Sequence, residues 1–136
     1  MTVSGECFCG AVRYEVFGKL RDARSCHCSR CRKAFSSQAS SYAEVDAGEF
    51  SWLAGEDLLT TYASEGGFGL QFCSKCGSTL CGVYKGAVHG VTLGCVNGDP
   101  GVEIGRHIYV ASRAAWEVIP DGVVTFQEGA PDSEFQ

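Results

Sequence analysis

The sequence predicts a mostly β protein, a single antiparallel β domain built from short strands. Glycine is abundant, at 18 of 136 residues, and there is one methionine, a composition typical of tight turns between short strands. Apolar and polar residues alternate over short segments, and no segment shows a sustained helical period. We expect the domain to cover residues 1–128 and residues 129–136 to form a flexible C-terminal tail.

The strands follow from this alternation, taken in chain order. Over residues 11–17, Val12, Tyr14 and Val16 share one face, which predicts a half-buried strand. One short helical turn is expected over residues 32–38. A hairpin is expected at residues 64–67, Ser-Glu-Gly-Gly, between two strand-like segments. The remaining strands are expected over residues 42–45, 50–53, 58–63, 68–72, 80–84, 88–96, 107–110 and 123–126.

The charge and the apolar content narrow the possible partners. The net charge is -5 and the pI about 5.1, so electrostatics do not favour a nucleic-acid partner. The first six residues are neither basic nor apolar, so we expect no signal peptide. No run approaches the roughly 18 apolar residues of a membrane span. We therefore expect a cytoplasmic protein, with no membrane partner, that is a monomer or a homodimer.

Nine cysteines are the most informative residues of the chain. In a reducing compartment, such a density in a short chain indicates metal ligands rather than disulfides. Seven of them form three clusters, Cys7-Phe8-Cys9, Cys26-His27-Cys28-Ser29-Arg30-Cys31 and Cys73-Ser74-Lys75-Cys76. Cys81 and Cys95 stand alone and are interpreted as small buried side chains, with Cys81 as a reserve ligand.

Two of the clusters are pairs that can combine into a closed zinc site. Residues two apart in an extended segment point to one side, and a C-x-x-C knuckle also presents two sulfurs together. Cys7 and Cys9 with Cys73 and Cys76 would then bind Zn²⁺ through four thiolates. Such a site would join distant segments, so we expect metal removal to unfold the protein. Spacing leaves a rival grouping open, a zinc ribbon of Cys28, Cys31, Cys73 and Cys76.

The middle cluster, Cys26, Cys28 and Cys31, holds three potential ligands by itself. Three protein ligands and one open position are typical of a catalytic zinc site. His27 should point away from the metal, as a second-layer or surface histidine, with a proton shuttle as the alternative. The chain is thus expected to bind two zinc ions.

These motifs resemble the glutathione-dependent formaldehyde-activating enzyme and centromere protein V family. The resemblance is carried by residues 6–15 (ECFCGAVRYE), 26–33 (CHCSRCRK) and 72–77 (FCSKCG), and by residues 107–113 (HIYVASR) followed by Trp116. It implies a zinc-stapled β fold, the β-tent, with two zinc ions. It also implies that Cys7, Cys9, Cys73 and Cys76 form the structural site and that Cys26, Cys28 and Cys31 form the catalytic site.

The family's activity is the condensation of glutathione with formaldehyde, and the family is classed among carbon–sulfur lyases. The resemblance therefore implies a lyase that acts on glutathione or a related thiol adduct. Three thiolates temper the Lewis acidity of zinc, which favours thiol chemistry over hydrolysis. Arg30, Arg32 and Lys33 could steer an anionic thiol to the metal, or could form a solvated charged turn.

Two other functions stay open on the sequence alone. The main alternative is a non-catalytic zinc-binding module that binds another protein. A microtubule or chromatin role, as in eukaryotic relatives, finds no support because the chain lacks a basic extension. A fixed fourth protein ligand at Cys26, Cys28 and Cys31 would favour the module over the enzyme.

Overall fold

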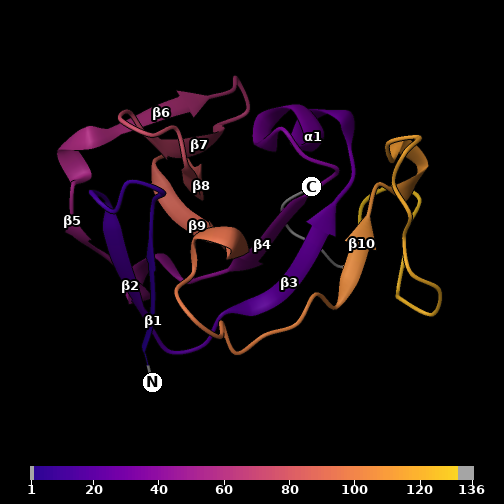
Figure 1. Cartoon of the computed structure of the whole chain (residues 1–136), viewed down its shortest axis with the longest axis horizontal. Coiled ribbons are helices and arrows are strands. Elements are labelled where there is room, and N and C mark those ends of the chain that lie inside the picture. The colour runs from indigo at the N-terminus through magenta and orange to yellow at the C-terminus, as the bar shows by residue number, and fades with distance from the viewer. Residues whose placement is uncertain (1, 132–136) are drawn as a thin grey trace. The chain divides into compact units, whose positions relative to one another are not determined.

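The computed structural model describes residues 2–131 and confirms the mostly β fold, with ten short strands and one α-helix (Figure 1). The chain divides into two compact units. The first contains the described residues up to Arg21 together with Ala43–Val102, and the second contains Asp22–Tyr42 together with the described residues from Glu103 onward. Residues 132–136 of the predicted tail lie outside the described residues. No helix of the described chain is long and apolar enough to cross a membrane.

A three-stranded antiparallel sheet opens the first unit. It has the order β1 (Thr2–Glu6), β2 (Arg13–Phe17) and β5 (Phe50–Ala54). The predicted alternation is confirmed, because Val12, Tyr14 and Val16 are each at most 1% exposed. The Tyr14 ring stacks on Phe50 at a centroid distance of 5.1 Å, which adds an aromatic contact to the apolar core.

Four further antiparallel strands of the first unit follow one another as a meander. They are β6 (Leu59–Ala63), β7 (Phe68–Cys73), β8 (Thr79–Tyr84) and β9 (Ala87–Thr92). The predicted hairpin at residues 64–67 joins β6 to β7, with Gly67 at φ +91°. The strand predicted over residues 88–96 ends at Thr92 instead.

Short 3-10 turns also belong to this unit. They are η1 (Ala47–Glu49), η2 (Glu56–Leu58) and η3 (Leu93–Cys95). The turn η3 begins directly after Thr92, so the extended conformation ends there and β9 is shorter than the alternation predicts.

The second unit is organised around β3 (Arg21–Cys26), which starts at the last residue before the unit, and β10 (Arg106–Ile108). These strands lie side by side and are parallel, with His107 opposite Ser25 and Ile108 opposite Cys26 (Figure 1). The prediction of an exclusively antiparallel domain is therefore wrong for this pair of strands. Parallel neighbours need a long connection, and almost eighty residues separate these two strands.

A further strand and a short 3-10 turn also belong to the second unit. β4 (Ser40–Glu44) begins in it and continues into the first unit, and η4 (Val110–Ser112) follows β10. The strand predicted over residues 123–126 is reduced to one bridge between Thr125 and His107. Ala130 is completely buried against Cys26 and Ile108, so the described end of the chain packs on this unit.

A partly buried ionic cluster holds β10 against β3. The Arg24 side chain is only 1% exposed and pairs with the Asp22 carboxylate. Arg106 of β10 donates to the same carboxylate from Nε at 2.9 Å. Because both guanidinium groups share one anion, Asp22 stabilises the register that places His107 beside the end of β3.

The single helix, α1 (Ser29–Phe35), starts earlier than the turn predicted over residues 32–38. Its N-cap is Cys28, whose Sγ accepts a hydrogen bond from the Cys31 backbone N–H at 3.3 Å. Its C-cap is Ser36, in the left-handed conformation at φ +52°. A cysteine is an unusual cap, so the sequence carried no ordinary signal for this start.

Candidate metal centres

The first cysteine cluster lies in the first unit, where two turns meet. Cys7 and Cys9 belong to the turn between β1 and β2, Cys73 ends β7, and Cys76 lies in the turn between β7 and β8. All four Sγ atoms lie within 4.8 Å of one another. Of the groupings that spacing left open, the structure thus brings together Cys7, Cys9, Cys73 and Cys76.

The distances between these sulfurs fit a tetrahedral zinc ion. A zinc–sulfur bond of about 2.3 Å implies sulfur–sulfur distances of about 3.8 Å at tetrahedral angles. Cys7 Sγ lies 3.6 Å from Cys9 Sγ, and Cys9 Sγ lies 3.9 Å from Cys73 Sγ. The cluster can therefore hold zinc without rearrangement of its backbone.

The backbone of both turns is shaped to present the sulfurs. Gly10 and Gly77 have φ values of +77° and +81°, which L side chains rarely adopt. Their N–H groups bond to the carbonyls of Cys7 and Cys73, at 3.0 and 2.8 Å. The N–H of Val12 donates to Cys7 Sγ at 3.3 Å, a contact that favours the thiolate.

The thiols of this cluster differ in their pKa values. Ser78 Oγ lies 3.4 Å from Cys76 Sγ, and this contact is the main cause that lowers the Cys76 pKa to about 5. Although the N–H of Ala11 acts to lower it, the pKa of Cys9 is raised to about 11 by lost hydration and by the neighbouring sulfurs. The cluster thus already holds thiolate character, as a metal site requires.

The second cluster lies in the second unit, at the junction of β3 and α1. Cys26 ends β3, Cys28 caps the helix and Cys31 lies in its first turn. Their Sγ atoms lie within 4.8 Å of one another, so this group can also hold a metal ion. No fourth His, Cys, Asp or Glu among residues 2–131 joins the group.

The surroundings of the second cluster are apolar on one side. Cys26 is buried with Ile108 and Ala130, and Tyr109 and Phe126 pack against this group. A hydrogen bond from the Cys26 thiol is the main cause that lowers the Cys31 pKa to about 6. The same bond, together with burial, raises the Cys26 pKa far above its ordinary value. The pKa values of these two neighbouring thiols are thus shifted in opposite directions.

His27, between two of the ligand candidates, is not at the surface. It is 2% exposed, and its Nε2 lies 2.9 Å from Nδ1 of His107 in β10. Sequence reasoning left a surface position open for His27. The structure excludes it, since the side chain is buried. The sequence could not foresee this, because the partner His107 is eighty residues away and only the pairing of β10 with β3 brings it close.

The three basic residues predicted to attract a substrate all lie on α1. Arg30 and Lys33 are exposed and Arg32 is half-buried. The charge of Arg30 adds to the lowering of the Cys31 pKa, after the hydrogen bonds to that sulfur. The Nε atom of Arg32 is buried and has no hydrogen-bond partner among the described residues.

The two isolated cysteines belong to neither cluster. Cys81 is completely buried, and its thiol donates to Gln71 Oε1 at 3.3 Å. Burial raises the Cys81 pKa to about 12, so this sulfur stays protonated. The Cys95 thiol donates to the Thr79 carbonyl at 3.5 Å. Both contacts agree with the interpretation of these residues as packed thiols.

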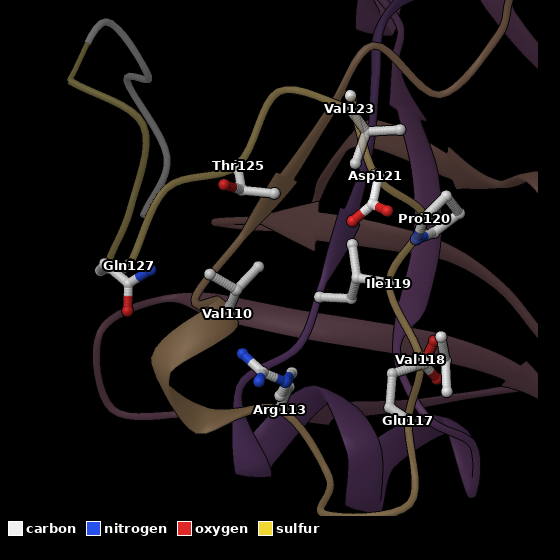
Figure 2. Close-up of a pocket in the computed structure, with 11 residues that line it drawn as sticks. Val110, Arg113, Glu117, Val118, Ile119, Pro120, Asp121, Val123, Thr125 and Gln127 are labelled. Atoms are coloured by element: carbon white, nitrogen blue, oxygen red, sulfur yellow. The ribbon is translucent and has the colours of Figure 1, made fainter.

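A hollow of about 470 Å³ lies in the second unit, between residues 110 and 127. Arg113 lines it on the side of η4, and Glu117, Ile119 and Asp121 line it from the facing segment (Figure 2). No motif predicted this hollow, because loop residues form it. No cysteine lines it, so it is separate from the candidate metal ligands.

Two comparisons with known proteins bear on this chain. The family model of the glutathione-dependent formaldehyde-activating enzyme matches residues 2–112. A crystal structure of a Rhodobacter sphaeroides protein, solved as a structural-genomics target, is similar with a TM-score of 0.55 and 24% sequence identity. That similarity covers 90% of this chain and 98% of the other, and it supports the fold.

Proposed function

The chain belongs to the glutathione-dependent formaldehyde-activating enzyme family, and from this membership we propose a zinc-dependent enzyme of thiol–aldehyde chemistry. The proposed reaction joins the sulfur of glutathione, or of a related thiol, to an aldehyde carbon, or cleaves the resulting carbon–sulfur bond. The observation that carries the proposal is the second cluster: three sulfurs within 4.8 Å, with no fourth protein ligand among the described residues.

Cys26, Cys28 and Cys31 are the proposed ligands of the catalytic metal. A zinc ion bound there would lower the pKa of a thiol in its remaining position and hold the resulting thiolate. The protein's own part is to gather three sulfurs on one rigid segment, where β3 ends and α1 begins. Their apolar neighbours Ile108 and Ala130 exclude water from one side of the cluster.

The proposed condensation balances without an oxidant or a reductant. The thiolate sulfur donates an electron pair to the carbonyl carbon, which forms the carbon–sulfur bond. The carbon–oxygen π electrons move to oxygen, and oxygen takes up the proton that the thiol has lost. The reverse sequence is the lyase reaction. The same cluster would serve both directions, because the bond that forms in one is the bond that breaks in the other.

The basic residues of α1 are proposed to attract the substrate. Arg30 and Lys33 are exposed on the helix that carries Cys31, in a chain with a net charge of -5. Glutathione is an anion at neutral pH, so a local positive field would raise its concentration near the metal. Arg32, half-buried on the same helix, is the third proposed member of this group.

The first cluster is proposed to be structural. Its four sulfurs would fill the coordination sphere of a zinc ion and leave no position for a substrate. It would tie the β1–β2 turn to the β7–β8 turn, more than sixty residues along the chain. A bound structural zinc contributes on the order of 10 kcal/mol or more in apparent free energy.

The test is a comparison of glutathione with its S-methyl derivative, on protein in which cobalt replaces zinc. A fourth thiolate should strengthen the sulfur-to-cobalt charge-transfer absorption. Glutathione should produce that change, and the S-methyl derivative should not, because its sulfur cannot become a thiolate. Equal binding of both peptides with no spectral change would overturn the proposal.

A non-catalytic, protein-binding module is the second candidate. The observation in its favour is a set of exposed apolar side chains in the C-terminal part of the second unit. Trp116 is 69% exposed, Val118 84% and Val124 54%. Such side chains suit a protein interface. If glutathione leaves the cobalt spectrum unchanged while a fixed fourth ligand is found at the second cluster, this function replaces the enzymatic one.

A further inference from the structure

His27 is held by β10 through two of its own polar groups. Its backbone N–H donates to the Ile108 carbonyl at 2.9 Å, and its ring Nε2 lies 2.9 Å from His107 Nδ1. Both partners are consecutive residues of β10, which is parallel to β3. His27 is the only residue between Cys26 and Cys28. These two contacts therefore fix the orientation of the peptide units that direct both sulfurs.

The burial of His27 decides which ring donates in this pair. His27 is 2% exposed, and its Nδ1 is buried with no hydrogen-bond partner among the described residues. A proton on Nδ1 would leave a buried N–H unsatisfied, which costs more than a bare nitrogen lone pair. The proton of neutral His27 therefore lies on Nε2 and is donated to His107 Nδ1, so that His107 carries its own proton on Nε2.

The geometry of the two rings favours this hydrogen bond. Nε2 of His27 and Nδ1 of His107 are 2.9 Å apart, and the ring planes meet at 32°.

We propose that His107 is a positioning residue for the second cluster: by accepting the His27 ring proton, it orients the Cys26–Cys28 segment for metal binding. His107 does not belong to the group of three sulfurs, and its proposed action is through His27. The proposal deepens the proposed function, since it concerns the same metal centre. Residues behind metal ligands commonly change metal affinity by about tenfold to a hundredfold when they are replaced.

Asparagine and glutamine substitutions separate hydrogen bonding from packing. The amide oxygen of asparagine occupies a place like that of histidine Nδ1, and the amide nitrogen of glutamine a place like that of Nε2. His107→Asn thus keeps the acceptor and His107→Gln loses it. For His27 the order reverses: His27→Gln keeps the donor and His27→Asn loses it.

The measurement is the affinity of the second cluster for Co²⁺, from its absorption during competition with a chelator. The phase that disappears in Cys28→Ala identifies that cluster. His107→Asn and His27→Gln should bind cobalt nearly as tightly as the parent, whereas His107→Gln and His27→Asn should bind about tenfold to a hundredfold more weakly. His89→Gln, in the first unit, is the control and should change nothing.

Two results would overturn the proposal. One is a loss that follows side-chain size, with both asparagine variants alike and both glutamine variants alike. The other comes from ¹⁵N spectra of the imidazoles in the unaltered zinc-loaded protein, which need no variant to fold. These spectra should show His27 and His107 both protonated on Nε2, and a proton on His27 Nδ1 contradicts the proposal. Glutathione is absent from both experiments, so failure of the proposed reaction leaves this inference standing.

Discussion

Gly5 of β1 lies directly opposite Tyr14 of β2, and a β-carbon at residue 5 would overlap the Tyr14 ring. Only glycine leaves the space in which the phenol lies across the neighbouring strand. The ring also stacks on Phe50 and meets the edge of Trp52. This placement buries the Tyr14 hydroxyl, which has no hydrogen-bond partner among the described residues.

Tyr14→Phe should therefore stabilise the protein. A buried hydroxyl without a partner costs about 1–3 kcal/mol, and phenylalanine keeps the ring contacts, so the free energy of unfolding should rise by about 1 kcal/mol. Urea denaturation at neutral pH measures this change. Tyr62→Phe is the control, because Tyr62 is 68% exposed and the loss of its hydroxyl should leave the stability nearly unchanged. A loss of stability in Tyr14→Phe would reveal a partner for the hydroxyl.

The same variant should alter the stability at alkaline pH. Burial raises the Tyr14 pKa above its ordinary value, so the folded state holds this proton more tightly than the unfolded state. The contribution of Tyr14 is thus complete below the ordinary tyrosine pKa of about 10 and is lost as the pH rises above it. The advantage of Tyr14→Phe over the parent should widen between about pH 10 and pH 11. An advantage that stays constant over this range would contradict the argument.

Metal analysis should find two zinc ions per chain. The two cysteine clusters are separate groups, each with its sulfurs within 4.8 Å of one another. Elemental analysis of protein purified without chelators gives the count, and titration with a chelator should remove the ions in two phases. The three-sulfur cluster should lose its ion first, because it supplies one ligand fewer. A count of one at saturating zinc, with the second cluster empty, removes the catalytic proposal.

Replacing one cysteine in each cluster should have different consequences. Cys73 is completely buried in the first cluster, so Cys73→Ala should abolish folding or solubility. Cys28→Ala should give a folded protein that has lost the weaker zinc. Circular dichroism and metal analysis distinguish the two results. Cys81→Ala is the matched control, a buried cysteine outside both clusters, and should keep both ions. A folded Cys73→Ala beside an unfolded Cys28→Ala would reverse the assignment.

Arg30→Ala should weaken the binding of glutathione about two- to fivefold at low salt and have little effect at high salt. Arg30 is exposed, so its attraction for an anion is long-range and is screened by ions. Titrations at about 20 mM and 500 mM ionic strength, monitored by the cobalt spectrum, provide the measurement. Lys85→Ala, an exposed lysine of the first unit, is the control. A loss that does not depend on salt would mean that Arg30 contacts glutathione directly.

The local pattern of the sequence was sufficient to predict most strands and turns of the first unit. Alternating apolar residues placed Tyr14 and its neighbours inside, and the glycine pair placed the turn between β6 and β7. These features depend on residues a few positions apart, which is the range over which side-chain periodicity and turn preferences act. The cysteine spacing likewise identified the seven candidate ligands, because each cluster is a short segment that can present its sulfurs together.

Only the tertiary structure decided which cysteines meet, how β10 pairs and where His27 points. Cys9 and Cys73 are 64 residues apart, and His27 and His107 are 80 apart. Spacing within a segment carries no information on such pairs, because they form only when separate strands have packed. The first residue of α1 also could not be predicted from local sequence, since the N-cap of the helix is a cysteine, Cys28. Local sequence pattern thus identified the candidate ligands and most strands of the first unit, and long-range packing determined which segments they meet.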